Sequence, residues 1–198
     1  MEIAIAPATY ALIASNLIIS LYAFYGDRGF INQFAFQVDA VTRRDEYWRV
    51  VTSSFIHANL PHLLMNMMTL YYFGPAVEKT LGKLGFLIVY FGAIIVSGIV
   101  SVMANRKNPA YSSVGASDAT SGVILSFCCF YPFASLYFFF LPIPIPAILF
   151  GVIFIFISAK LMGNEGKVIA HEGHLGGALG GAALTVLMRP EVITTIFA

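Results

Sequence analysis

Apolar runs, interrupted by short polar or glycine-containing breaks, occupy most of this chain of 198 residues. A helix needs about 20 mostly apolar residues to cross the hydrocarbon core of a membrane. We therefore predict an all-α membrane protein with six transmembrane helices, folded as a single domain over residues 1–198. The runs and breaks place these helices at residues 3–25, 60–81, 84–104, 117–131, 146–162 and 168–188.

The fourth predicted helix is shorter than the others and begins with polar residues. From Ser117 to the break at Pro132 an ideal helix rises only ~22 Å, whereas the hydrocarbon core is ~30 Å thick. If this helix ends at one membrane surface, Ser117 lies below the other surface, next to a glycine-containing turn. A helix N-terminus also presents free backbone N–H groups. A serine nucleophile and an oxyanion site could be built there.

Two connecting segments differ from ordinary loops. Residues 26–59 mix charged, aromatic and apolar side chains, a composition that predicts a structured first loop at the membrane–water interface. Within it, composition alone favours Trp48 and Arg49 as an interfacial anchor. Three alternating prolines exclude a regular helix in residues 132–146, so we expect a connection that lies in the interface.

Composition indicates the same class of protein. Hydrophobic residues make up 59% of the chain and charged residues 11%, and a soluble domain could not bury so much apolar surface. The net charge of +1 gives no reason to expect a nucleic-acid partner. Cys128 and Cys129 are adjacent and cannot easily pair with each other, so they indicate no redox compartment.

The last predicted helix carries glycines at a regular spacing. Glycines four residues apart form the small-xxx-small pattern of a membrane helix whose backbone packs closely on a neighbour. The two rows are Gly173, Gly177 and Gly181, and Gly176 and Gly180.

Polar residues on three helices are expected at one depth. In a bundle of six crossings, the second, fourth and sixth helices enter from the same side. His62 and Asn66 lie in the first turns of the second helix, Ser117 begins the fourth, and His174 lies roughly 9 Å into the sixth. Intramembrane ionisable residues are costly and are functional by default. A serine, a histidine and amide donors at one depth suit a nucleophile, its base and an oxyanion hole.

Each of these residues also has a simpler interpretation. Ser117 could be a helix cap, and His62 and Asn66 could bond each other across one turn. The histidines at 57, 62, 171 and 174 could instead bind a metal. However, the His-Glu-Gly-His spacing is not that of a hydrolytic HExxH zinc motif, and we expect no metal or other cofactor. The shared side and depth favour the catalytic interpretation.

These residues resemble the motifs of the rhomboid family of intramembrane serine proteases, in order, from about residue 48 to residue 181. The matching positions are Trp48-Arg49, Phe55-Ile56-His57, His62 to Met67 with Asn66, Phe73-Gly74, Glu78, Gly82, Gly115-Ala116-Ser117, His174 to Gly177, and Gly181.

The resemblance implies a six-helix bundle with a Ser117–His174 dyad and no third acid. Ser117 would attack the scissile carbonyl and His174 would carry the proton to the leaving amine. His62, Asn66 and the Ser117 N–H would stabilise the oxyanion. It also implies membrane-protein substrates whose transmembrane helix enters from the lipid bilayer beside the fifth helix. We expect a multi-pass protein of a bacterial cytoplasmic membrane.

The chain departs from the family pattern after the nucleophile. Asp118 stands where the family usually has glycine, and Ser121 stands where some relatives carry a tyrosine that packs on the catalytic histidine. Ser121 is also a rival nucleophile, but it lies deeper and lacks the free N–H groups of the helix start. Gly115, Asp118 and His171 are therefore candidate modulators of the site.

The charges of the loops disagree with the orientation that the family implies. Most lysines and arginines lie in the odd-numbered loops, so the positive-inside rule would turn the mouth of the site toward the cytoplasm. The family usually opens it to the other side, and we follow the family. Two alternative functions stay open, namely an inactive rhomboid-like protein that binds transmembrane helices and a histidine-based metal transporter.

Overall fold

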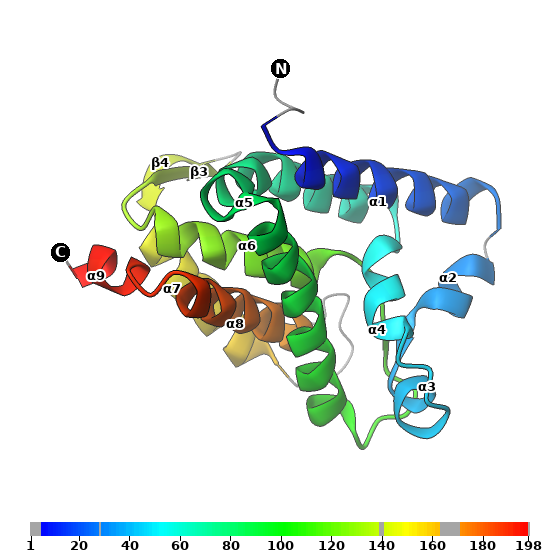
Figure 1. The fold of residues 1–198 in the computed structure, drawn as a ribbon. Helices are drawn as coiled ribbons and strands as arrows, with labels where there is room; N and C mark the ends of the chain where they lie inside the picture. The colour runs from blue at the N-terminus through cyan, green and yellow to red at the C-terminus, as the bar shows by residue number, and fades with distance from the viewer. Residues whose placement is uncertain (1–4, 28, 139–140, 163–170, 198) are drawn as a thin grey trace.

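The computed structural model describes residues 5–27, 29–138, 141–162 and 171–197 (Figure 1). Its helices are α1 (Pro7–Tyr25), α2 (Gly29–Phe34), α3 (Val38–Arg43), α4 (Arg49–Thr52), α5 (Leu60–Asn105), α6 (Ser117–Phe130), α7 (Ala147–Leu161), α8 (His171–Met188) and α9 (Val192–Phe197), with a 3-10 turn η1 (Ser53–Phe55). The strands are β1 (Phe36–Gln37), β2 (Ser112–Ser113), β3 (Ser135–Phe138) and β4 (Leu141–Pro146), which pair antiparallel as β1 with β2 and β3 with β4.

The 46-residue helix α5 is interrupted at Gly82, where φ is 74° and ψ is 167°. Glycine adopts this left-handed φ without a steric penalty. The interruption separates the two helices that the sequence predicts at residues 60–81 and 84–104. Helices α1, α6, α7 and α8 likewise fall inside predicted ranges, although the start expected at residue 168 lies outside the described residues. Among those residues, α1 and α5 are long and apolar enough to cross a membrane.

Helix α6 lies in the middle of the bundle, between α5 and α8 (Figure 1). Phe86, Tyr90 and Ile94 of α5 are fully buried in one apolar cluster with Ala119 and Val123 of α6. Burying such side chains is the main favourable term for a packed core in water, and in lipid the same close packing supplies dispersion energy. The close packing of α5 on α6 therefore holds the polar N-terminal end of α6 in a fixed position.

The glycine rows of α8 face two different helices. A side chain at Gly177 would overlap the backbone of Asp118 in α6, and one at Gly181 would overlap the backbone of Gly122. The other row faces α5, where a Cβ at Gly176 would lie 2.9 Å from the Ser97 Cα. The predicted close packing of this helix is thus confirmed, with α6 and α8 in direct backbone contact.

A buried carboxylate fastens α1 to α5. Glu78 accepts hydrogen bonds from the N–H groups of Ala8 and Thr9 at 2.9 and 2.7 Å, and from the Thr9 hydroxyl at 2.8 Å. The first N–H groups of a helix have no partner within the helix, and the helix dipole favours negative charge there. Glu78 therefore caps α1 from another helix.

The first loop is structured, as predicted, but Arg49 has a different role. Its buried guanidinium donates to the carbonyls of Asn32 and Ala35 at 3.2 and 2.9 Å, pairs with Glu46 and lies 4.7 Å from the centre of the Trp48 ring. The interpretation of Arg49 as an interfacial anchor is therefore wrong. Composition could not distinguish an arginine that ties a loop together from one that reaches lipid headgroups.

Strands β3 and β4 occupy the proline-rich connection for which the sequence excludes a helix. Prolines lack an N–H group and are tolerated in edge strands, where alternate N–H groups face away from the partner. Pro146 is opposite Ser135, and Ile145 is opposite Leu136. The absence of a helix from the described part of this connection is confirmed, but the strand pairing was not predicted.

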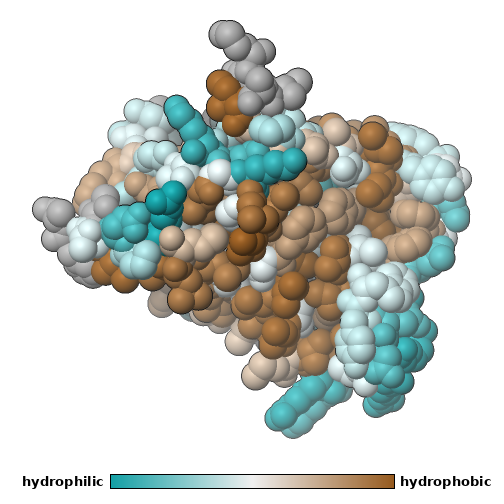
Figure 2. Space-filling model, viewed as in Figure 1, coloured by the Kyte–Doolittle hydropathy of each residue, from teal (hydrophilic) through white to brown (hydrophobic). Residues whose placement is uncertain are grey.

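The surface shows the separation expected for a membrane protein. In Figure 2, brown apolar side chains cover the middle of the view over α5 and α8, and teal polar side chains gather at the lower right around α3. Large exposed apolar residues on α5 and α7 include Ile95, Ile99 and Phe156. Apolar surface on this scale fits contact with lipid, with the first loop toward water.

We predict that Gly177→Ala lowers the unfolding temperature, because the added methyl group would push α8 away from the backbone of α6. Overpacking of this kind costs roughly 1–3 kcal/mol. Gly151→Ala in α7 is the matched control, since its Cβ would meet the side-chain ends of Leu125 and Cys128 at 3.2 and 3.5 Å. Both changes gain the same helix propensity, about 1 kcal/mol. Thermal unfolding in detergent measures the difference, and equal stability of the two variants would contradict the close packing.

Candidate active site

The turn before α6 is held by hydrogen bonds to the first loop. Gly115 has a φ of 123°, which favours glycine, and its N–H donates to the Ser53 carbonyl at 3.0 Å. The Ala116 N–H donates to Nε2 of His57 at 3.3 Å. Helix α6 then begins at Ser117, whose own N–H has no acceptor within the described part of the chain. This N–H is free to bind a ligand oxygen.

His57 is fully buried and acts as the anchor of this turn. Its Nδ1 lies 2.9 Å from the Ser20 hydroxyl, which itself donates to the Phe55 carbonyl at 3.1 Å. His57 therefore carries its proton on Nδ1, and Nε2 accepts from Ala116. Burial, with a smaller contribution from nearby His62, lowers the pKa of His57 to about 3, so the ring stays neutral in this role.

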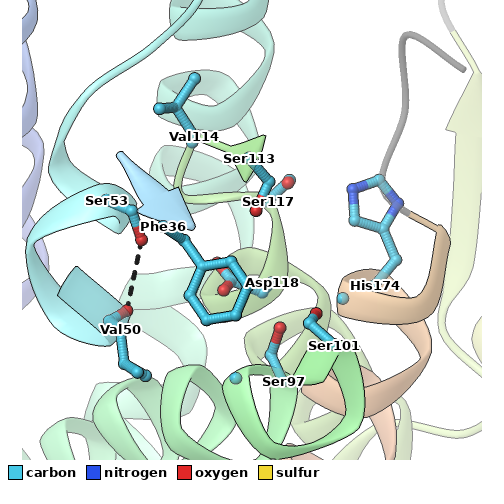
Figure 3. A pocket seen from close by; sticks show the side chains of 13 residues that line it. Phe36, Val50, Ser53, Ser97, Ser101, Ser113, Val114, Ser117, Asp118 and His174 are labelled. Atoms are coloured by element: carbon cyan, nitrogen blue, oxygen red, sulfur yellow. Dashed lines mark hydrogen bonds between the residues drawn. The ribbon is translucent and has the colours of Figure 1, made fainter. Parts of the chain in front are cut away.

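Ser117 and His174 line the same small cavity, which has a volume of about 30 Å³. In Figure 3 the His174 ring extends from the first turns of α8 on the side of the cavity nearest Ser117. Ser97 and Ser101 of α5 also line it. No hydrogen bond joins the Ser117 hydroxyl to His174 in the described structure. In enzymes, such a hydrogen bond often becomes short and well aligned only when substrate binds. The predicted pair is thus brought to one cavity from two helices.

Phe154 of α7 supports the His174 ring from the other side. The two rings lie 18° from parallel with centroids 6.2 Å apart, within the range of aromatic contacts. The His171 ring lies edge-on to the His174 ring, with the two ring centroids 6.1 Å apart. The expected departure at Ser121 left no aromatic contact for His174 from that position, and Phe154 makes such a contact from α7. The sequence contains 18 phenylalanines, and no pattern distinguishes this one.

A second cavity, of about 290 Å³, reaches His174 from the side of α7. Its lining is almost entirely apolar, with Phe150, Ile153 and Ile157 on α7 and His171 and His174 on α8. An apolar hollow of this size can hold a side chain or a short stretch of a hydrophobic segment. His174 therefore lines both the small cavity that contains Ser117 and the apolar one.

His62 and Asn66 lie beside the turn before Ser117. The His62 ring packs directly on Gly115, where any side chain would overlap it. The Asn66 amide nitrogen donates to the backbone carbonyl of His62 at 3.0 Å, and its oxygen accepts from the Thr120 hydroxyl at 3.0 Å. The two predicted side chains thus flank α6, and Asn66 bonds the backbone of His62 rather than its ring. Thr120 was not singled out from the sequence.

Asp118 lines the same cavity, but its carboxylate is hydrogen-bonded to groups outside the predicted pair. Its Oδ1 accepts from the Ala119 N–H at 3.0 Å and from the Ser54 hydroxyl at 3.4 Å. The Ser97 side chain of α5 lines the same cavity. The two hydrogen bonds fit a carboxylate that caps the first turn of α6 and ties it to the first loop.

Ser121, the rival nucleophile predicted from the sequence, is less exposed than Ser117. It is buried, and its hydroxyl donates to the Ser117 carbonyl at 2.6 Å. Within the described residues, no three histidine, cysteine or acidic side chains form a group that could hold a metal ion. His57 is also unsuited to a metal, because both of its ring nitrogens are engaged by the protein.

Comparison with known proteins identifies the family. A family model of the Rhomboid domain matches residues 44–191. The chain is 41% identical to YdcA of Bacillus subtilis (strain 168), a protein assigned to the rhomboid proteases, over 39% of this chain and 38% of that protein. It is 31% identical to Rhomboid-like protease 3 of Toxoplasma gondii over 74% of this chain and 54% of that protein. It is 33% identical to Inactive RHOMBOID-like protein 8 of Arabidopsis thaliana over 44% of this chain and 25% of that protein.

The chain spans between a quarter and about half of the length of these relatives. The family match extends slightly beyond the motifs at residues 48–181 and includes the dyad candidates, the flanking polar residues and the glycine rows. The resemblance inferred from those motifs is confirmed: this chain is a member of the rhomboid family.

Proposed function

We propose that the protein is an intramembrane serine protease that uses a dyad of Ser117 and His174. The observation that carries the proposal is that these two side chains, from helices in backbone contact, line one cavity in a rhomboid domain. Two of the matched relatives bear the name of proteases. A serine and a histidine placed together supply a nucleophile and its base.

The reaction follows from the positions of these groups. Ser117 Oγ attacks the scissile carbonyl carbon while His174 takes the hydroxyl proton, and His174 returns this proton to the leaving amine. The negative charge on the carbonyl oxygen is stabilised by the Ser117 N–H, His62 and Asn66. Water then hydrolyses the ester on Ser117. The cavity of about 30 Å³ has room for one such water, and Ser97 and Ser101 offer it hydrogen bonds.

The proposed setting is a multi-pass protein that crosses the bilayer six times. Helix α6 has 14 residues and rises only ~21 Å, so its start lies inside a hydrocarbon core of ~30 Å. Substrates would be membrane proteins whose transmembrane helix approaches beside α7, where the apolar cavity reaches His174. A bacterial cytoplasmic membrane and a site that opens away from the cytoplasm remain predictions.

The second candidate function is a catalytically inactive rhomboid-like protein that binds transmembrane helices. Two observations favour it: Ser117 and His174 are not hydrogen-bonded in the described structure, and Asp118 stands beside the nucleophile. One matched relative is named as inactive. Cleavage assays separate the two functions, because only a protease releases fragments from a bound substrate.

We predict that the purified protein in liposomes cleaves members of a panel of single-span membrane proteins, and that Ser117→Ala and His174→Ala each abolish this activity. The double variant should be no slower than either single variant, because the two residues act as one unit. Product formation on gels measures the rates. Cleavage that persists in Ser117→Ala and disappears in Ser121→Ala would move the nucleophile by one turn.

We expect Asn66→Ala to lower kcat by about 100- to 1000-fold with little change in KM, the usual effect of removing one oxyanion donor. His62→Ala should act in the same way. The reason is that both groups gain strength only as charge develops on the substrate oxygen. If either variant changed KM alone, its assignment to the oxyanion hole would be wrong.

We expect Asp118→Gly to cleave at least as fast as the parent but to unfold at a lower temperature. The carboxylate bonds Ala119 and Ser54 rather than the dyad, and loss of a cap costs ~1 kcal/mol. Asp118→Asn, which keeps a capping oxygen, should retain both properties. Cleavage rate and thermal stability are measured together, and a stably folded Asp118→Gly without turnover would contradict the cap.

A further inference from the structure

We propose that Thr120 is a positioning residue that keeps one N–H group of the Asn66 amide directed toward the reaction centre. Thr120 lies on α6, three residues after Ser117, and its hydroxyl is 3.0 Å from the Asn66 Oδ1. The inference rests on the proposed protease function and adds a residue to the site that the sequence motifs do not contain.

The orientation of the Asn66 amide follows from its two neighbours. Nδ2 lies 3.0 Å from the His62 carbonyl oxygen, which can only accept a hydrogen bond. Oδ1 lies opposite the Thr120 hydroxyl, which can donate. Exchanging the amide oxygen and nitrogen would bring two carbonyl oxygens to 3.0 Å, a repulsive contact. The His62 carbonyl therefore selects the orientation, and the Thr120 hydroxyl holds it by donating to Oδ1. One N–H of the amide is on His62, and the second has no acceptor among the described residues and is available to an oxyanion.

Burial makes this hydrogen bond hard to replace. Thr120 is 4% exposed and Asn66 is 5% exposed, so water has little access to either group. Without the hydroxyl, the amide oxygen would be an unsatisfied buried acceptor and would gain by rotating toward another donor. Rotation would turn a lone pair toward the developing negative charge. A donor of the oxyanion hole would then become a source of repulsion.

Thr120 also links Asn66 to the nucleophile. Its hydroxyl lies 3.2 Å from the backbone carbonyl of Ser117. The Thr120 side chain therefore contacts both the proposed nucleophile, Ser117, and the proposed oxyanion donor, Asn66. The shorter distance is the one to Asn66 on α5. Thr120 thus links α5 and α6 at the point where both contribute to the proposed site.

Thr185 provides a matched control for Thr120. Its buried hydroxyl also bonds a backbone carbonyl of its own helix. Thr185 is fully buried in α8, and its hydroxyl lies 2.8 Å from the Gly181 carbonyl and 2.7 Å from the Ser126 hydroxyl of α6. It thus makes the same two kinds of contact, one within its helix and one across to a neighbour. It touches neither member of the proposed dyad.

The experiment compares Thr120→Val with Thr185→Val, since valine keeps the shape of threonine and removes the hydroxyl. We expect Thr120→Val to lower kcat by about 10- to 100-fold, because displacing a catalytic group by ~1 Å can cost about 100-fold. KM should change less than about two-fold, since the amide acts in the transition state rather than in substrate binding. Thr120→Ser should restore most of the rate, and Thr185→Val should lower thermal stability without changing kcat.

The same change is then made in Asn66→Ala, where no amide remains to be positioned. Thr120→Val should have less than about a two-fold further effect there, because coupled residues are not additive. An unchanged kcat in Thr120→Val, or an equal loss with and without Asn66, would overturn the inference while the protease function stands. A parent protein that cleaves no substrate and gives the same result as Ser117→Ala would overturn both.

Discussion

The direct contact between the backbones of α6 and α8 is the constraint on which the rest of the site depends. Gly177 rests on the backbone of Asp118, and Gly181 rests on that of Gly122, so no side chain separates the two helices. His174 lies one turn before Gly177 and Ser117 lies one residue before Asp118. The close contact therefore brings a histidine and a serine to one cavity. In lipid, where apolar side chains gain little by leaving their surroundings, close packing of this kind is a main source of helix association.

Buried polar groups then fasten the other elements to this pair of helices. Glu78 takes the free N–H groups at the start of α1, His57 takes the N–H of the turn before α6, and Asp118 ties α6 to the first loop. An unsatisfied polar group costs several kcal/mol in hydrocarbon, so each such contact is specific in its geometry. These buried polar residues serve largely to fix the positions of the helices and of the turn before α6, and few groups are left for the proposed chemistry.

The sequence predicted the long helices well because they depend on local features, whereas the short helices α2, α3, α4 and α9 were not predicted. Run length and glycine breaks located the helices, and the four-residue spacing of glycines anticipated the contact of α8 with its neighbours. The polar positions of Ser117, His62 and Asn66 stood out because polar side chains are rare in apolar helices. Their convergence on one site followed from the parity of the crossings and from family motifs, and the structure brings them to neighbouring positions.

Features that depend on contacts between distant segments could not be predicted in this way. A threonine in an apolar helix usually bonds its own backbone, so nothing in the sequence marks Thr120 as a partner of Asn66. Phe154 contacts His174 because of the rotation of α7 about its own axis. The sequence does not predict this rotation, since α7 is apolar on all sides. Arg49 stabilises the first loop from inside only because the carbonyls of Asn32 and Ala35 face its guanidinium.

The central claim is that Ser117 is a nucleophile activated by His174. Reaction with a fluorophosphonate probe, followed by mass spectrometry of the labelled peptide, tests this claim most directly. We expect one adduct, on Ser117, that is lost in His174→Ala; an adduct on Ser121, or none on the folded parent protein, would contradict the account.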